Sequence, residues 1–191
     1  MTPTSLHFRA CIAVTAIWTA LMLPNSRGRD HLYADSHRPT EYQVKAAYLA
    51  NFAKFVEWPP GAITDDSPIP VCVAGQDPFG PALDSAVSGE SVRGHPLVVR
   101  RIGDMRDVNG CRVLFVPSNE ALIESAVVSA ERMPLLTVSD APDFLKRGGM
   151  IKFVLDSNRV RFEINLAAAK TAGLNLSSEL LRVATAVRKT P

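Results

Sequence analysis

Two cysteines are the residues of this chain whose chemistry is easiest to define. Beyond the N-terminal segment the chain contains only Cys72 and Cys111, each at a short apolar run typical of a buried strand. An even pair of cysteines in an exported chain favours a disulfide. In a doubly wound sheet the first and third strands are commonly neighbours, which would bring the two Cα atoms within bridging range. We therefore predict a disulfide, with two buried free thiols as the alternative.

The other residue types that could perform chemistry do not form a catalytic pattern. His95 is the only histidine beyond the N-terminal linker, and it precedes a proline at a strand entry, as a loop residue would. No cluster of Cys and His has the spacing of metal ligands. The chain also lacks a Gly-x-Ser-x-Gly elbow, a P-loop and a dinucleotide fingerprint. The sequence predicts no catalytic residue, no metal site, no cofactor and no enzymatic activity.

Three charged residues, Lys152, Arg161 and Glu163, are the ones for which we expect a binding role. They lie on two predicted strands, residues 150–155 and 160–164, joined by the turn at 156–159. In the second strand apolar and charged residues alternate, which indicates one wet face, and Arg161 and Glu163 are expected to form a surface ion pair. Because an edge hairpin with alternating charge often meets another chain, we predict a partner-binding surface here. A merely solvated edge is the alternative.

Composition and the N-terminus indicate an exported domain. The 21 basic and 19 acidic residues give a net charge of +2 without a basic stripe, so nucleic-acid binding is not expected. Arg9 precedes an uncharged apolar run, residues 10–23, that is shorter than the roughly 20 residues of a membrane span. Such a run is typical of a signal peptide. We predict a signal peptide and linker over residues 1–35, with a retained membrane anchor as the alternative.

The remaining elements predict one α/β domain over residues 41–191. A helix is expected over residues 41–59, without a clear wet face, followed by strands that alternate with helices. A last helix should begin at Ser177 and carry an apolar stripe through Val187. This order predicts a three-layer α/β/α sandwich whose sheet is mostly parallel, with a C-terminal antiparallel hairpin at its edge.

A second functional hypothesis concerns the carboxyl ends of the predicted parallel strands. Polar loops follow these strands at residues 74–75, 117–119 and 139–140. Ligands bind to doubly wound sheets in the crevice at this edge. The sequence is therefore also compatible with a small-ligand-binding sensor domain, although ordinary turns contain the same residue types.

Two separate blocks of the sequence resemble the YfiR-like family of periplasmic proteins. The first block contains Lys45–Ala47 and Asn51–Pro59. The second contains Gly148–Ile151, Arg161–Leu166, Ala172–Leu174 and Ser177–Leu181. The two blocks stand in the same order as in the family, and the resemblance covers nearly all of the chain after residue 40.

This resemblance implies a function. Members of the family are periplasmic negative regulators that hold an inner-membrane diguanylate cyclase inactive by binding its periplasmic sensor region. Capture by an outer-membrane OmpA-like lipoprotein, or a redox change, releases the cyclase and raises cyclic di-GMP. The family fold is an α/β/α sandwich that tends to form homodimers. Cys72 and Cys111 match a family disulfide, and the absence of a second cysteine pair weakens the expectation of redox sensing. Many relatives serve sensor kinases or other receptors, which are the alternative partners.

Overall fold

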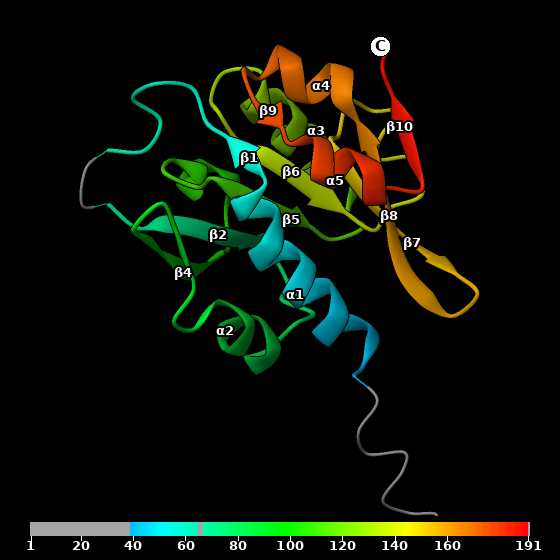
Figure 1. Ribbon diagram of the computed structural model, residues 1–191, viewed down its shortest axis with the longest axis horizontal. Coiled ribbons are helices and arrows are strands. Elements are labelled where there is room, and N and C mark those ends of the chain that lie inside the picture. The colour runs from blue at the N-terminus through cyan, green and yellow to red at the C-terminus, as the bar shows by residue number, and fades with distance from the viewer. Residues whose placement is uncertain (1–38, 65–66, 191) are drawn as a thin grey trace, which may run out of the picture. The chain divides into compact units, whose positions relative to one another are not determined.

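A computed structural model of the chain describes residues 39–64 and 67–190. The described chain forms a mostly parallel sheet of eight strands in the order β10-β8-β7-β6-β5-β2-β4-β3, and a small sheet of β1 and β9. Figure 1 shows the arrangement of the strands and helices. The strands are β1 (Val56–Glu57), β2 (Ile69–Ala74), β3 (Ser91–Val92), β4 (His95–Ile102), β5 (Val113–Val116), β6 (Leu136–Ser139), β7 (Ile151–Asp156), β8 (Arg159–Asn165), β9 (Asn175–Leu176) and β10 (Ala186–Arg188). The helices are α1 (Glu41–Lys54), α2 (Pro81–Val87), the 3-10 helix η1 (Met105–Val108), α3 (Glu120–Ala130), α4 (Leu166–Thr171) and α5 (Ser178–Val183). The predicted signal peptide and linker lie outside the described residues.

The connections between parallel strands produce the three predicted layers. β2 leads through α2 to β4 on one side of the sheet, whereas β5 leads through α3 to β6 on the other side. Because such crossovers are right-handed, α2 and α3 must cover opposite faces. Figure 1 shows α1 crossing in front of the sheet, and α1 packs beside α2. The two connections diverge between β2 and β5, which places a possible ligand crevice at the carboxyl ends of these strands.

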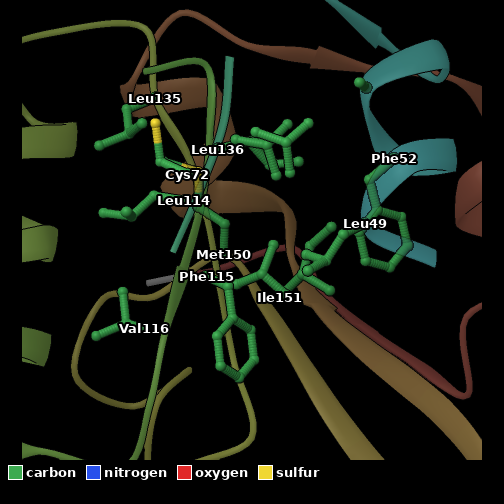
Figure 2. Packing of buried hydrophobic residues seen from close by; sticks show 14 of the residues in the cluster. Leu49, Phe52, Cys72, Leu114, Phe115, Val116, Leu135, Leu136, Met150 and Ile151 are labelled. Atoms are coloured by element: carbon green, nitrogen blue, oxygen red, sulfur yellow. The ribbon is translucent and has the colours of Figure 1, made fainter. Parts of the chain in front are cut away.

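The helix α1 is held to the sheet by an aromatic cluster. Leu49 and Phe52 are fully buried and project from α1 toward the side of the sheet where Ile151 lies (Figure 2). The ring of Phe52 lies 5.8 Å from that of Phe153 and 5.0 Å from that of Phe162, measured between centroids. Each such aromatic pair contributes about 0.5–1.5 kcal/mol beyond the area that it buries. A capping box between Thr40 and Gln43 fixes the start of the helix.

Two details of the predicted first helix are wrong. The helix does have a wet face, because the exposed residues follow one another at helical spacing: Gln43, Ala47, Asn51 and Lys54. It also ends at Lys54, earlier than predicted, because the chain continues into β1, where Val56 pairs with Leu176 of β9. The N–H of Ser177 donates to the carbonyl oxygen of Phe55 at 2.9 Å and closes this small sheet. The pairing with β9 therefore ends the helix upstream of Pro59 and Pro60.

The predicted hairpin is present as β7 and β8, whose residues pair from Ile151 with Ile164 to Asp156 with Arg159. The two turn residues, Ser157 and Asn158, both have positive φ angles, of 49° and 59°. This is the pattern of a type I′ turn, whose twist matches that of the strands that it joins. The turn residues and the pairing of the two strands therefore specify the same register.

The C-terminus departs from the prediction. The last helix, α5, ends at Val183, and the following residues form β10, which pairs in parallel with β8 and places Ala186 opposite Glu163. Both the N–H and the hydroxyl of Thr185 donate to the carbonyl oxygen of Phe162. The predicted apolar stripe through Val187 and the predicted edge position of the hairpin are therefore wrong. The physical reason is that the open edge of β8 offers backbone groups that a short strand can satisfy.

Candidate functional site

The crevice at the strand ends, where the sequence allows a ligand, is occupied by side chains of α1. Asp140, just beyond β6, accepts hydrogen bonds from the Nζ of Lys45 at 2.8 Å and from the hydroxyl of Tyr42 at 3.2 Å. The hydroxyl of Ser118, just beyond β5, donates to the same carboxylate at 3.4 Å. The Tyr42 ring also packs edge-on against Phe79 at 5.4 Å. The polar groups of the crevice therefore bind one another.

The charges of this cluster are matched within the chain. Lys45 is only 3% exposed, and its Nζ also lies 2.5 Å from a carboxylate oxygen of Glu41, one helical turn earlier. Burial lowers the pKa of Lys45, but the hydrogen bonds that its ammonium group donates to Asp140 and Glu41 outweigh burial and leave the pKa above its ordinary value. Burial and the nearby Asp140 raise the pKa of Tyr42. Lys45 is thus a charged anchor that fixes α1 over the strand ends.

The sequence contains a signal for this anchor, which the prediction of the first helix missed. Lys45 lies on the same stripe as Leu49 and Phe52, at the spacing i, i+4 and i+7 of a buried helix face. A lysine at that position must have a buried partner, because an unpaired buried charge is costly. The partner itself could not be found from the sequence, since Asp140 lies 95 residues away.

The three residues predicted to bind a partner lie on one face of the hairpin. Lys152 faces Glu163 in the β7–β8 register, and its Nζ lies 2.8 Å from a carboxylate oxygen of Glu163. Arg161 faces Val154 instead. The expected ion pair between Arg161 and Glu163 is therefore wrong, because directly opposed side chains on neighbouring strands are closer than side chains two positions apart. Arg161 forms no ion pair with any residue that the structure describes.

The outer half of the hairpin extends past its neighbouring strands. β6 pairs with β7 only at residues 151 and 152, and β10 pairs with β8 only at residues 163 to 165. Figure 1 shows the two strands projecting beyond the rest of the sheet, below α5 and to the right of α1. Over residues 153–161 each strand therefore pairs only with the other. Leu155 near the tip is 57% exposed. Unpaired strand edges of this kind are templates for a further strand.

Cys72 and Cys111 form the disulfide that the sequence predicts. Cys72 lies within β2 and Cys111 two residues before β5, its neighbour in the sheet, and their Cα atoms are 5.9 Å apart. Both residues are fully buried. The bond is therefore shielded from solvent thiols as long as the domain stays folded.

His95, which the sequence predicts to be a loop residue, contacts the backbone of another segment. The Nδ1 of His95 lies 2.9 Å from the carbonyl oxygen of Ser67. Within residues 39–64 and 67–190, no group of three or more His, Cys, Asp or Glu side chains is placed to hold a metal ion. None of the helices in this part of the chain is long and apolar enough to cross a membrane.

Comparison with known proteins identifies a family and a solved structure of related fold. A family model described as YfiR/HmsC-like matches residues 42–185. The crystal structure of a conserved domain protein from Vibrio cholerae O1 biovar El Tor superimposes with a TM-score of 0.53 at 13% sequence identity. The match covers 78% of this chain and 60% of that one, and at this identity it shows a shared fold alone. No curated protein matches the chain.

Proposed function

Because this chain belongs to the YfiR/HmsC-like family, we propose that it is a periplasmic regulatory binding protein that represses a membrane signalling enzyme. The enzyme would be a diguanylate cyclase, held inactive through its periplasmic sensor region. The observation that carries this proposal is the family match over residues 42–185. The protein would act by occupying the surface of another protein, without a catalytic group of its own.

The buried disulfide supports a periplasmic location. Disulfides form and persist in oxidising compartments and are rare in the cytosol. The bond between Cys72 and Cys111 joins two neighbouring elements of the central sheet, so it belongs to the folded core. We propose that residues 1–35 supply the signal peptide and the linker that bring the domain to this compartment.

We propose the outer half of the β7–β8 hairpin as the surface that binds the cyclase. Main-chain N–H and C=O groups along its open edges can pair with an extended segment, which gives affinity with little dependence on side chains. Arg161 and Arg159 add positive charge without an ion-pair partner among the described residues, which favours an acidic segment. Lys152 and Glu163 neutralise each other at the base of the same face.

The function can be tested in cells that contain the neighbouring cyclase. Deleting the protein should raise cyclic di-GMP, and restoring the wild-type chain should lower it. In a pull-down the protein should also recover the detergent-solubilised cyclase. An OmpA-like lipoprotein and a second copy of this chain are the other partners that we propose. Unchanged cyclic di-GMP after deletion, with no membrane partner recovered, would reject the proposal.

A small-ligand sensor that serves a sensor kinase or another receptor is the second candidate function. The strand-end crevice supports it poorly, because Tyr42, Lys45 and Asp140 already bind one another there. A cavity on another part of the molecule supports it better.

A further inference from the structure

A cavity of about 310 Å³ lies between α3, α4, the segment before β7 and the end of β10. This volume is at the lower end of the range of small-molecule sites, roughly 300–1,000 Å³. Its most buried apolar lining residues are Ala130, Leu145 and Met150, and Ala168 and Val127 complete an aliphatic wall. Among the described residues that line it, none is aromatic. The cavity is therefore suited to an aliphatic chain rather than to a stacked ring.

One buried amide lines this aliphatic cavity. Asn165 is 5% exposed; its Oδ1 accepts from the N–H of Ala168 at 3.1 Å, and its Nδ2 donates to the carbonyl oxygen of Leu145 at 3.1 Å. A carboxamide has two N–H donors and two acceptor lone pairs. One donor and one lone pair of Asn165 therefore remain for another polar group. A buried polar group with spare capacity in an aliphatic cavity favours a ligand that carries a polar end.

The rim of the cavity carries a cation beside this amide. Arg188 is exposed, lies opposite Asn165 in the parallel register of β10 and β8, and forms no ion pair within the described part of the chain. The other cation at the rim, Lys146, already pairs with Asp143 at 3.0 Å. A guanidinium group binds a carboxylate through two parallel hydrogen bonds. The lining also includes one exposed carboxylate, Glu131, at the end of α3. Arg188, which lies opposite Asn165, is therefore the rim cation best placed to bind a single carboxylate.

We propose that this cavity binds a small aliphatic monocarboxylate. Its acyl chain lies among Ala130, Leu145 and Met150, and its carboxylate binds Arg188 at the rim, with the free N–H of Asn165 as a second donor. Because Arg188 belongs to β10, which pairs with β8 at Glu163 to Asn165, an occupied cavity would also hold the end of the sheet next to the hairpin. The proposal does not depend on the identity of the protein partner.

Isothermal titration calorimetry of the purified full-length protein with sodium octanoate, below its micelle concentration, tests this site. We expect saturable binding of one octanoate per chain. Methyl octanoate, which lacks the negative charge, should bind at least about tenfold more weakly, because a hydrogen bond to a charged group contributes roughly 1.5–3 kcal/mol. The absence of saturable binding, or equal binding of the ester, would overturn the proposal.

Two pairs of variants locate the site. Arg188→Gln should weaken octanoate binding at least about tenfold, whereas Arg159→Gln, at the hairpin tip, should leave it unchanged. Ala168→Phe should fill the cavity and abolish binding, whereas Ala47→Phe, on the wet face of α1, should not. Melting curves report whether each variant folds. Because Arg188 is exposed, its substitution should not prevent folding. Equal weakening by Arg159→Gln would place the carboxylate elsewhere and reject the site.

Discussion

At the scale of single residues, the Gly-Gly pair before β7 shows how closely a local motif is determined by its neighbours. Gly148 has a φ angle of +96°, a conformation that residues with a side chain rarely adopt. Gly149 has no such angle, but a Cβ atom at this position would overlap the ring of Phe144. Phe144 is fully buried, so the ring cannot move into solvent. One glycine is therefore required by the backbone and the other by packing.

Replacing Gly149 tests this packing argument. Gly149→Ala should lower the free energy of unfolding by about 1–3 kcal/mol, as overpacking of a closely packed core does. Gly103→Ala is the matched control, because nothing lies within 4 Å of a Cβ atom there and its φ angle is not positive. Urea unfolding followed by circular dichroism measures both. Equal stability of the two variants would contradict the contact with Phe144.

The anchor of α1 is a second feature at this scale. Lys45 is buried between Asp140 and Glu41, so removing Asp140 leaves the buried ammonium group with a single carboxylate. Asp140→Ala should lower the free energy of unfolding by roughly 3 kcal/mol, the lower end of the cost of breaking a buried pair.

The control for this variant is Asp143→Ala. Asp143 pairs with Lys146, and both side chains are more than half exposed. Because exposed ion pairs contribute little, the control should stay within about 1 kcal/mol of the wild type in thermal and urea unfolding. If both variants lose the same small amount, the cluster at the strand ends is not an anchor.

At the scale of elements, the disulfide links β2 to the chain just before β5 and closes a loop with a sequence separation of 39 residues. In the chain-entropy account, a loop of this length stabilises the fold by roughly 4 kcal/mol through its effect on the unfolded chain. Replacing both Cys72 and Cys111 by Ala should therefore lower the free energy of unfolding by up to this amount. Urea unfolding of the two proteins, without reductant, gives the difference. An unchanged unfolding midpoint would show that the bond adds little to stability.

The hairpin β7–β8 is the element on which the proposed partner binding depends. Arg161→Glu reverses a charge on its outer face without removing an ion pair within the described chain. It should raise cyclic di-GMP toward the level of the deletion strain and reduce recovery of the cyclase at least about tenfold, as loss of a close charge pair at an interface does.

A matched variant separates this surface from a general effect of charge. Arg132→Glu, on the exposed segment after α3, should leave both readouts at the wild-type level. Glu163→Lys is a less direct test, since it also destroys the pair with Lys152. If the Arg161→Glu variant still represses the cyclase fully, the hairpin is not the surface that binds the partner.

At the scale of the whole molecule, the proposed role requires that the chain be exported from the cytosol. The full-length protein should appear in the periplasmic fraction, with Cys72 and Cys111 protected from alkylation even after denaturation. A variant without residues 1–35 should remain in the cytosol, where both cysteines should react after denaturation, because the cytosol keeps thiols reduced. Alkylation followed by mass spectrometry distinguishes the two states. Reactive cysteines in the exported protein would contradict the disulfide.

The sequence predicted those features that depend on neighbouring residues. Alternating apolar and charged residues predicted β8, and the side chain of Ser177 predicted the start of α5. The order of strands and helices predicted the three layers, because right-handed crossovers leave few alternatives. The blocks that resemble the YfiR-like family predicted the family itself.

The tertiary structure alone decided which distant residues meet. It placed Asp140 beside Lys45, joined Glu163 to Lys152 rather than to Arg161, and converted the end of the last predicted helix into β10. It also closed the strand-end crevice and formed a cavity between α3 and α4. The physical reason is that helix periodicity and caps act over a few residues. Strand edges, buried charges and cavities are instead satisfied by segments that the sequence separates and only the fold brings together.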